Sequence, residues 1–376
     1  MNKFKLLTSA ISIMAACSAE ASSRVCQMTG GLNNLNSSSF NQLYQGSKTA
    51  TNYQTLVYLL NQGTRKIYIP GNTVIRVPNQ RKALELHSGQ TVFSDRGINH
   101  SQGAQLLVNY INDEQNDYPV IVMNSQSRIS GLRIQGPTPS TDSNNQTIGI
   151  QFAVGSDHIT VDNNEIYYWP WAGISVKQSL NNLITANYIH DNIKSGLGYG
   201  VVVQNGNAQA EISCNVFDAN RHDIAGRGLE GEGYYAHNNL VLNGGERGAY
   251  HAFDMHKGST GHGGKSITIT DNIFDFGRYG TSNRSSIYLR GIPTSGKATV
   301  NGNIFTQSWN VGSQVAISGI EGSLQDELLL QRINRFNVAV NYYKQGDQCF
   351  FSYQNAGLVT QPVVCNAVSS LINAKN

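Results

Sequence analysis

The densest group of reactive side chains in the sequence lies between residues 220 and 256. Histidines, which titrate near neutral pH, stand there among acids and arginines, and ionisable groups that converge on one place are typical of acid and base catalysis. The candidate catalytic residues in this stretch are His222, Asp223, Arg227, His251, Asp254 and His256. For His222 and His251 a second interpretation stays open, in which each ring lies at the edge of the core and bonds to a carbonyl.

These groups suit β-elimination from a polysaccharide that contains uronic acids. In that reaction a base removes the proton beside a carboxylate, and cationic groups stabilise the charge that develops. Arg227, Arg290 or Lys177 would neutralise the carboxylate, and His256 or His222 would act as base or acid. We therefore expect a polysaccharide lyase that acts on an acidic chain.

Hydrolysis by two carboxylates is the second enzymatic interpretation. Asp223 and Asp254 are expected one coil and two residues apart, roughly 8 Å between Cα atoms from the strand spacings. Inverting glycosidases hold their carboxyl groups about 6.5–9.5 Å apart. Glu230 or Glu232 could replace one of the pair, and a non-catalytic adhesin or glycan-binding protein is a third alternative.

An asparagine repeat indicates the fold that positions these residues. Short segments that end in Asn-x-Ile, Asn-x-Phe or a related pattern place the shared residue at Asn164, Asn187, Asn215, Asn239, Asn272 and Asn303. The intervals are 23, 28, 24, 33 and 31 residues, which is the range of a solenoid. We expect these asparagines to form one column at a turn that tolerates left-handed backbone, with amides bonded from coil to coil.

The segments between the turns predict strands. They are short, β-branched, alternate apolar with polar residues, and are separated by Gly and Asn. The fold class expected is all-β, a right-handed parallel β-helix with short helical caps. Stacked coils of this kind pair their backbones and bury one continuous apolar core.

The repeats, together with strands such as Gly149-Ile-Gln-Phe152 and Gly173-Ile-Ser-Val176, resemble those of the pectin-lyase-like superfamily. The resemblance covers roughly residues 66–320. It implies a right-handed β-helix, and many members cleave acidic polysaccharides. Lyases, hydrolases, esterases, epimerases and adhesins all occur in the superfamily, so the fold alone does not select a reaction.

Alternation along one strand of each coil assigns its faces. The inward pairs expected are Ile150/Phe152, Ile174/Val176, Val201/Val203, Ile224/Gly226, Phe253/Met255, Ile287/Leu289 and Val315/Ile317. The residues after each pair form an outward column, Ala153, Lys177, Gln204, Arg227, His256, Arg290 and Ser318. The column before it is Gln151, Ser175, Val202, Ala225, Asp254, Tyr288 and Ala316. The ladder of basic residues in the first column would extend over about 25 Å of sheet at the coil spacing. We predict that Arg227, Asp254, His256 and Arg290 project from one sheet face into one groove beneath the loop over residues 226–233.

Aromatic residues and a glycine-rich loop complete the expected groove. Trp169 and Trp171 precede the strand that ends at Lys177, and they either form a wall on which sugar rings stack or pack the turn. Gly226-Arg-Gly-Leu-Glu-Gly231 matches a dinucleotide fingerprint, but no helix follows it, so we expect a loop overhanging the site. The substrate-binding residues expected are Lys177, Gln204, Arg290, Tyr288, Trp169, Trp171 and Glu232.

Composition and the first residues bear on partners and compartment. Charged residues are 14% of the 376 and the net charge is +3, which gives no bulk attraction to nucleic acid. Residues 1–21 predict a signal peptide that ends at Ala19-Glu-Ala21, and hence a secreted or periplasmic protein. The alternative is a lipoprotein anchored through Cys17, without which no membrane association is expected. The expected partner is an acidic polysaccharide. The sequence specifies no cofactor with certainty, and Ca²⁺ is the candidate, with Asp254 as a ligand.

The remaining organisation follows from the ends of the repeats. Residues 22–65 are expected to form an extension with a cap helix at 53–61, and 66–320 the β-helix, entered by a strand at 66–70. Residues 321–376 are expected to form a C-terminal cap, in which Ser323 caps a helix over 324–335. Cys349 and Cys365 are the first-choice disulfide, stapling an open end, whereas Cys214 is interpreted as a buried thiol in a strand.

Overall fold

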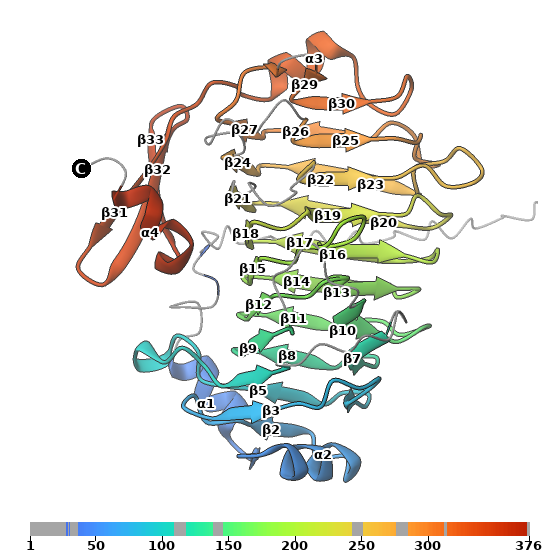
Figure 1. Ribbon diagram of the computed structural model, residues 1–376. Coiled ribbons are helices and arrows are strands. Elements are labelled where there is room, and N and C mark those ends of the chain that lie inside the picture. The colour runs from blue at the N-terminus through green and yellow to red at the C-terminus, as the bar shows by residue number, and fades with distance from the viewer. Residues whose placement is uncertain are drawn as a thin grey trace, which may run out of the picture.

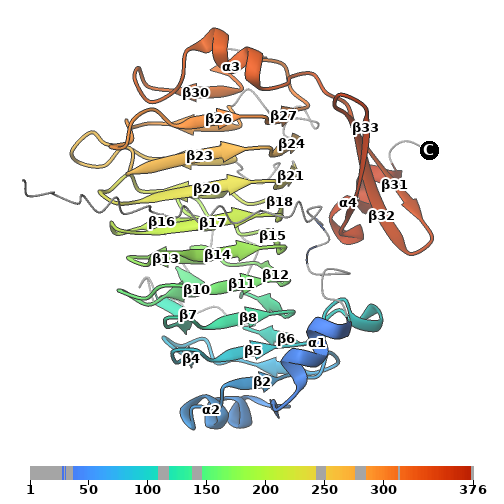
Figure 2. The same cartoon turned by 180° about the vertical axis from the view of Figure 1, so that it is seen from behind.

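The computed structural model is a stack of β-coils, described over residues 28, 30, 37–108, 118–137, 146–242, 251–275, 285–311 and 314–373. Its strands run side by side up the stack in three parallel sheets, as Figures 1 and 2 show from opposite sides. Apolar side chains from all three sheets fill the interior as one cluster. The predicted parallel β-helix is confirmed, and the expected signal sequence at 1–21 lies outside the described residues.

Each sheet takes one strand from each coil. The first sheet contains, in spatial order, β1 (Lys48–Thr49), β2 (Lys66–Tyr68), β5 (Thr91–Phe93), β8 (Arg128–Ser130), β11 (Thr160–Asp162), β14 (Asn182–Thr185), β17 (Gln209–Ser213), β20 (Gly233–His237), β23 (Ser266–Thr270) and β26 (Thr299–Asn301). The second contains β4 (Leu84–Leu86), β7 (Tyr118–Met123), β10 (Thr147–Phe152), β13 (Ala172–Lys177), β16 (Tyr199–Gln204), β19 (His222–Gly226), β22 (Phe253–Met255), β25 (Ile287–Leu289) and β30 (Ile317–Gly319). The third contains β3 (Val74–Arg76), β6 (Gln105–Leu107), β9 (Arg133–Gln135), β12 (Glu165–Tyr167), β15 (Tyr188–His190), β18 (Val216–Asp218), β21 (Leu240–Leu242), β24 (Ile273–Asp275) and β27 (Ile304–Phe305).

The asparagine column predicted from the repeat is confirmed. Each amide in it bonds the next, so that Asn215 Oδ1 accepts from Asn187 Nδ2 and Asn215 Nδ2 donates to Asn239 Oδ1, both at 3.0 Å. Asn334 extends the column by one coil, since Asn303 Nδ2 donates to it at 3.0 Å. The left-handed backbone conformation was expected at the ladder asparagine itself. It is instead adopted by the residue before each of the predicted ladder asparagines. These residues, all with φ between 53° and 70°, are Asn163, Ala186, Cys214, Asn238, Asp271 and Gly302, and Gly131, with φ 72°, holds the same place one coil earlier, before Leu132.

Helices lie at both ends of the stack (Figure 1). Helix α2 (Tyr53–Asn61) matches the prediction, begins after the N-cap Asn52 and buries Leu56 and Leu60. Helix α1 (Ser37–Tyr44) precedes it, and the short β1 already pairs with β2, so the stack begins before residue 66. The 3₁₀ turn η1 (Ile98–His100) lies in an early coil.

The helix predicted over residues 324–335 is shorter than expected. Helix α3 (Glu327–Ile333) begins after the N-cap Asp326, whose carboxylate accepts from the backbone of Leu328 and Leu329. Ser323 bonds the Ile320 carbonyl instead of capping the helix. A small hairpin, β28 (Asn310–Val311) and β29 (Gln314–Val315), precedes β30.

The last residues form a module beside the stack rather than over its end (Figures 1 and 2). It consists of an antiparallel sheet, β31 (Val340–Gln345), β32 (Gln348–Gln354) and β33 (Leu358–Val363), followed by α4 (Cys365–Asn373). Apolar residues of the module pack on the outer face of the third sheet in a second core. The segment was expected to cover the open end of the last coil. It packs instead against the side of the stack.

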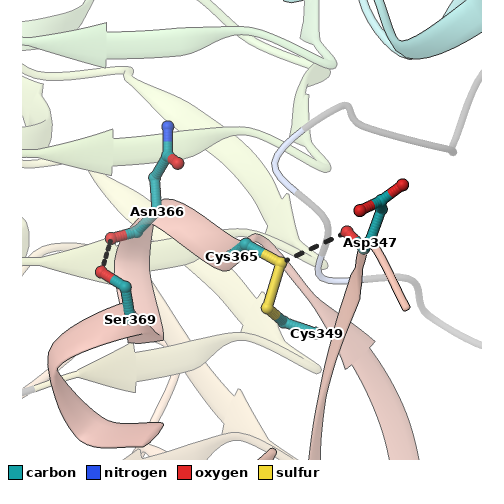
Figure 3. Close-up of a disulfide and its surroundings, with 5 residues drawn as sticks. All are labelled: Asp347, Cys349, Cys365, Asn366 and Ser369. Carbon is teal, nitrogen blue, oxygen red and sulfur yellow. Dashed lines mark hydrogen bonds between the residues drawn. A yellow bond between two sulfur atoms is a disulfide. The ribbon is translucent and has the colours of Figure 1, made fainter. Parts of the chain in front are cut away.

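The disulfide expected within this module is confirmed. Cys349 and Cys365 are bonded, with 5.1 Å between their Cα atoms (Figure 3). Cys214 is also disulfide-bonded, which corrects its interpretation as a buried thiol, and it lies in the turn between β17 and β18. Disulfides persist in oxidising compartments, and these bonds are consistent with an extracellular or periplasmic protein.

Across the part of the chain that the structure describes, no helix has the length and apolar character needed to span a membrane.

Candidate functional site

The outer face of the second sheet carries the predicted basic column. Lys177 pairs with Gln204, and the register of Val203 with Gly226 places Arg227 beside Gln204. The backbone nitrogens of Arg227, His256 and Arg290 then bond the carbonyls of Val203, Gly226 and Met255, at 3.3, 2.9 and 2.8 Å. The column is thus continuous over its middle coils.

The last coil differs from the prediction by two residues. Ile317 pairs with Ile287, and Ser318 therefore pairs with Tyr288 and not with Arg290. Ile317 is the buried inward residue at the start of this strand, and Val315, which was predicted to be inward, lies in the hairpin β28–β29.

Asp254 is the centre of the site. Its carboxylate is fully buried, and its Oδ2 lies 2.6 Å from Arg290 Nη2. The same oxygen lies 3.1 Å from His256 Nε2 and 3.6 Å from His222 Nε2. Three side chains from adjacent coils therefore converge on one carboxylate. His222 is the first residue of β19, and His256 and Arg290 directly follow β22 and β25.

The electrostatics of this cluster keep Asp254 ionised. Burial acts to raise the pKa of Asp254, but contact with His256 and the charge of Arg290 outweigh it, and the pKa lies below its ordinary value. Burial lowers the pKa of His222 to about 3. Its ring is consequently neutral at neutral pH, and a neutral imidazole has one N–H and one lone pair.

Hydrogen bonding fixes the tautomer of His222. Its Nδ1 lies 2.7 Å from the carbonyl of His251, and because a carbonyl only accepts, Nδ1 donates. The lone pair is then on Nε2, the atom that faces Asp254. His251 repeats the motif one coil on, with Nδ1 2.9 Å from the Ser285 carbonyl. Both histidines thus make the carbonyl bond of the alternative interpretation.

Aromatic rings form a row beside the carboxylate. Trp171 meets Tyr199 edge to face at 5.6 Å between ring centroids, Tyr199 stacks on His222 at 5.7 Å, and His251 contacts Tyr288 at 4.6 Å. The guanidinium of Arg290 lies over the ring of Tyr288, 5.2 Å from its centroid. This row borders the basic column along the strand starts of the second sheet.

An open hollow of about 450 Å³ lies between the row and the column. Its floor is apolar, formed by Val202 and Ala225, and the other lining residues are Gln146, Trp171, Leu197, Tyr199, Gly226, Arg227, His256 and Lys257. His256 belongs both to the hollow and to the Asp254 cluster. Arg227, Asp254, His256 and Arg290 therefore lie on one face of the sheet, but only Arg227 and His256 line the hollow, whereas Asp254 is fully buried and Arg290 bonds it.

Trp169 is not part of this face. It is fully buried in the main core, and its Nε1 donates to the Ile134 carbonyl at 3.1 Å. Only Trp171 of the expected pair lines the hollow, because the chain turns between them, after Tyr168 in the left-handed region with φ 66°.

Asp223 and Glu232 have structural partners, whereas Glu230 is exposed on the loop. Asp223 is buried and accepts from Asn220 Nδ2 at 2.9 Å, and burial raises its pKa well above the ordinary value. The backbone nitrogens of Asp223 and Ile224 both bond the Ala252 carbonyl, so the strand begins with an irregular hydrogen bond at Asp223. The expected pairing of Asp223 with Asp254 across the groove is therefore not observed.

Glu232 holds the loop over residues 227–232. It is fully buried, and its carboxylate accepts from the backbone nitrogens of Gly206 at 3.0 Å and Leu229 at 3.1 Å. The loop packs against the loops of both neighbouring coils: Asn207 N bonds the Glu230 carbonyl, and a Cβ at Gly228 would meet the carbonyl of His256. It therefore continues the stack instead of overhanging the groove.

The remaining predicted binding residues lie on the expected face. Gln204 is buried and donates to Ser175 Oγ at 2.7 Å, Lys177 is half-buried beside it, and Arg227 is exposed with Nη1 3.5 Å from Asn205 Oδ1. Sequence reasoning missed Tyr199 and Lys257. The sequence pattern could have identified Tyr199. It stands two residues before the inward Val201, as His222 stands two residues before the inward Ile224, so the two side chains occupy equivalent places on adjacent coils.

Comparisons with known proteins address the fold. A family model described as "right handed beta helix region" matches residues 52–243 and 119–321. An alginate lyase from Paenibacillus sp. strain FPU-7 is similar at 16% identity with a TM-score of 0.48, over 77% of this chain and 97% of that one. ORF18 of Geobacillus virus E2 is similar at 11% identity with a TM-score of 0.40, over 86% and 77%. The Dettilon tailspike protein gp208 is similar at 13% identity with a TM-score of 0.30, over 87% and 79%.

No curated protein matches the sequence.

Proposed function

This chain belongs to the right-handed β-helix family, and on that premise we propose that the outer face of its second sheet cleaves an acidic polysaccharide by β-elimination. The observation that carries the proposal is the contact of Asp254 with His256 and Arg290 at the edge of a hollow lined by further cations. A base, groups that neutralise a carboxylate, and an apolar floor for a sugar ring are thus side by side.

His256 is the proposed base. Its Nε2 faces Asp254, and 37% of its side chain is exposed, so Nδ1 is the nitrogen available to a substrate. Proton transfer to Nδ1 creates an imidazolium, which the ionised Asp254 stabilises through Nε2. His222 is fully buried beneath this pair and does not meet the glycan.

The elimination balances with groups that line the hollow. His256 takes the proton from the carbon beside the uronate carboxylate, the electron pair forms a carbon–carbon double bond, and the glycosidic C–O bond breaks. Arg227 and Lys257 neutralise the carboxylate. Tyr199 donates a proton to the departing oxygen, a role favoured by burial, which raises its pKa and keeps the hydroxyl protonated.

Hydrolysis is less well supported. An inverting hydrolase needs one protonated carboxyl and one carboxylate facing the sugar from opposite sides. Asp223 and Glu232 are both buried and bonded to other protein groups, and the pKa of Asp254 is lowered, which leaves it ionised.

The test is incubation of the protein with acidic and neutral polysaccharides while near-ultraviolet absorbance and reducing ends are followed together. Elimination raises both signals on an acidic chain, because it leaves an unsaturated sugar. We expect His256→Gln to lose at least about 10²-fold of the rate, the scale of a positioned acid or base. The matched control is His158→Gln, an exposed histidine also paired with an aspartate, at 3.0 Å from Asp157.

Two outcomes contradict the proposal. New reducing ends without absorbance would show a hydrolase, and binding to the acidic chains without either signal would show an adhesin.

A further inference from the structure

We infer that His222, Asp254 and His256 form a binding site for a divalent cation of the zinc class, and that occupation of this site switches off the base. The binding site itself is independent of the proposed reaction. Its regulatory effect rests on the proposed role of His256.

The distances fit a tetrahedral ion. One ligand atom from each of the three side chains lies within 4.8 Å of the others. Zinc at about 2.0–2.1 Å from each ligand would hold its ligand atoms roughly 3.3 Å apart. The separations of Asp254 Oδ2 from His256 Nε2 and His222 Nε2, 3.1 and 3.6 Å, lie on either side of that value.

The orientation of His222 is that of a metal ligand. Its Nδ1–H donates to the His251 carbonyl, which directs the Nε2 lone pair at a carboxylate oxygen, where two acceptors face each other. A cation between them converts this repulsion into attraction. Metal-bound histidines commonly donate their other N–H to a carbonyl or carboxylate in this way.

The contact of His256 with Asp254 also differs from an ordinary ion pair. Although Nε2 and Oδ2 are 3.1 Å apart, His256 Nε2 is buried and makes no hydrogen bond among the described residues. Asp254 Oδ1 is likewise buried without a hydrogen-bond partner in that part of the chain. Arg290 Nη2 bonds Oδ2, the oxygen that also faces both histidines, so a cation bound there shares Oδ2 with the guanidinium, and Oδ1 is a second carboxylate donor.

The donor set selects the type of cation. Two imidazole nitrogens and one carboxylate oxygen suit zinc and similar transition metals, with a fourth position left for water. Calcium prefers six to eight oxygen ligands, so the donor set of this cluster does not fit the Ca²⁺ expected as a candidate from the sequence.

Occupation of the site changes the chemistry of His256. A neutral imidazole carries one proton, and coordination through Nε2 places that proton on Nδ1. The nitrogen that faces the groove then has no lone pair and cannot accept a proton from a sugar. Metal binding and the proposed base function are therefore mutually exclusive.

The test uses Zn²⁺ alone, added to chelator-treated full-length protein and followed by calorimetry, with Co²⁺ absorption as a spectroscopic reporter of tetrahedral coordination. We expect one ion per chain, bound at least tenfold more weakly by His256→Gln and Asp254→Asn. His158→Gln is the matched control and retains binding. Circular dichroism of each variant confirms that it is folded.

The outcomes separate the two proposals. Failure of Zn²⁺ to bind, or equal binding by wild type and both variants, overturns the site whether or not the protein is a lyase. Binding by a protein that cleaves no glycan keeps the site and refutes the proposed function. Full lyase activity with Zn²⁺ bound overturns the switch, whereas inhibition relieved by a chelator supports it.

Discussion

Replacing Trp169 and Trp171 in turn by alanine separates the core of the stack from the groove. Trp169 is fully buried, and Trp169→Ala leaves a cavity in the core and removes the bond from Nε1 to the Ile134 carbonyl. Truncation of a buried tryptophan costs about 3–5 kcal/mol of unfolding free energy. Trp171→Ala opens space onto the hollow rather than a sealed cavity, and we expect a cost of about 1–2 kcal/mol.

For glycan affinity we expect the opposite order, with the larger effect from Trp171→Ala. An aromatic ring stacked on a planar partner contributes about 0.5–1.5 kcal/mol beyond burial, so loss of Trp171 should weaken glycan binding about 2- to 13-fold. Trp169→Ala should leave the affinity of the folded protein unchanged. Urea unfolding and calorimetric titration with an acidic oligosaccharide measure the two effects. Equal stability losses for the variants, or unchanged affinity in Trp171→Ala, would refute this assignment of faces.

Two further predictions concern stability. Asn272→Ala removes the bonds of its Nδ2 to Asn303 Oδ1 and to two carbonyls and should cost about 2–4 kcal/mol by urea unfolding, whereas the exposed Asn301→Ala should change stability by less than about 0.5 kcal/mol. A similar cost in both variants would contradict the ladder as a source of stability. Burial acts to lower the pKa of His190, but Asp191 and Glu165 outweigh it and raise the pKa above 6.5. The charged His190 therefore adds to the free energy of unfolding. This contribution is complete below about pH 6.5 and is lost as the pH rises through the raised pKa of His190. Unfolding of wild type and His190→Gln from pH 5 to 9 checks this, and a difference between them that grows with pH would contradict it.

The sequence alone determined the coil and most of its register. The Asn column, the inward pairs of the middle coils and the α2 helix follow from local patterns, because a solenoid repeats the same short-range geometry with each turn. Alternation likewise placed Arg227, Asp254, His256 and Arg290 on one face. Each of these inferences needed only neighbours in sequence or one coil away.

Only the tertiary structure decided the direction of the side chains at the ends of strands. Trp169 and Trp171 differ by two residues and would share a face in a strand, yet the corner after Tyr168 sends one into the core and the other into the hollow. Asp223, at the irregular start of its strand, is likewise buried and accepts a hydrogen bond from Asn220. Corners and strand ends depend on how consecutive sheets meet, which a period-2 pattern along one strand does not encode.

The site itself was fixed by contacts between coils. Sequence placed His222 and Asp254 on adjacent coils, but the convergence of His222 Nε2, His256 Nε2 and Arg290 Nη2 on one oxygen depends on rotamers and on the carbonyl that orients His222. The C-terminal module packs beside the third sheet for a similar reason. Its apolar face matches a patch formed by strands from several coils, and such a surface exists only once the stack has formed.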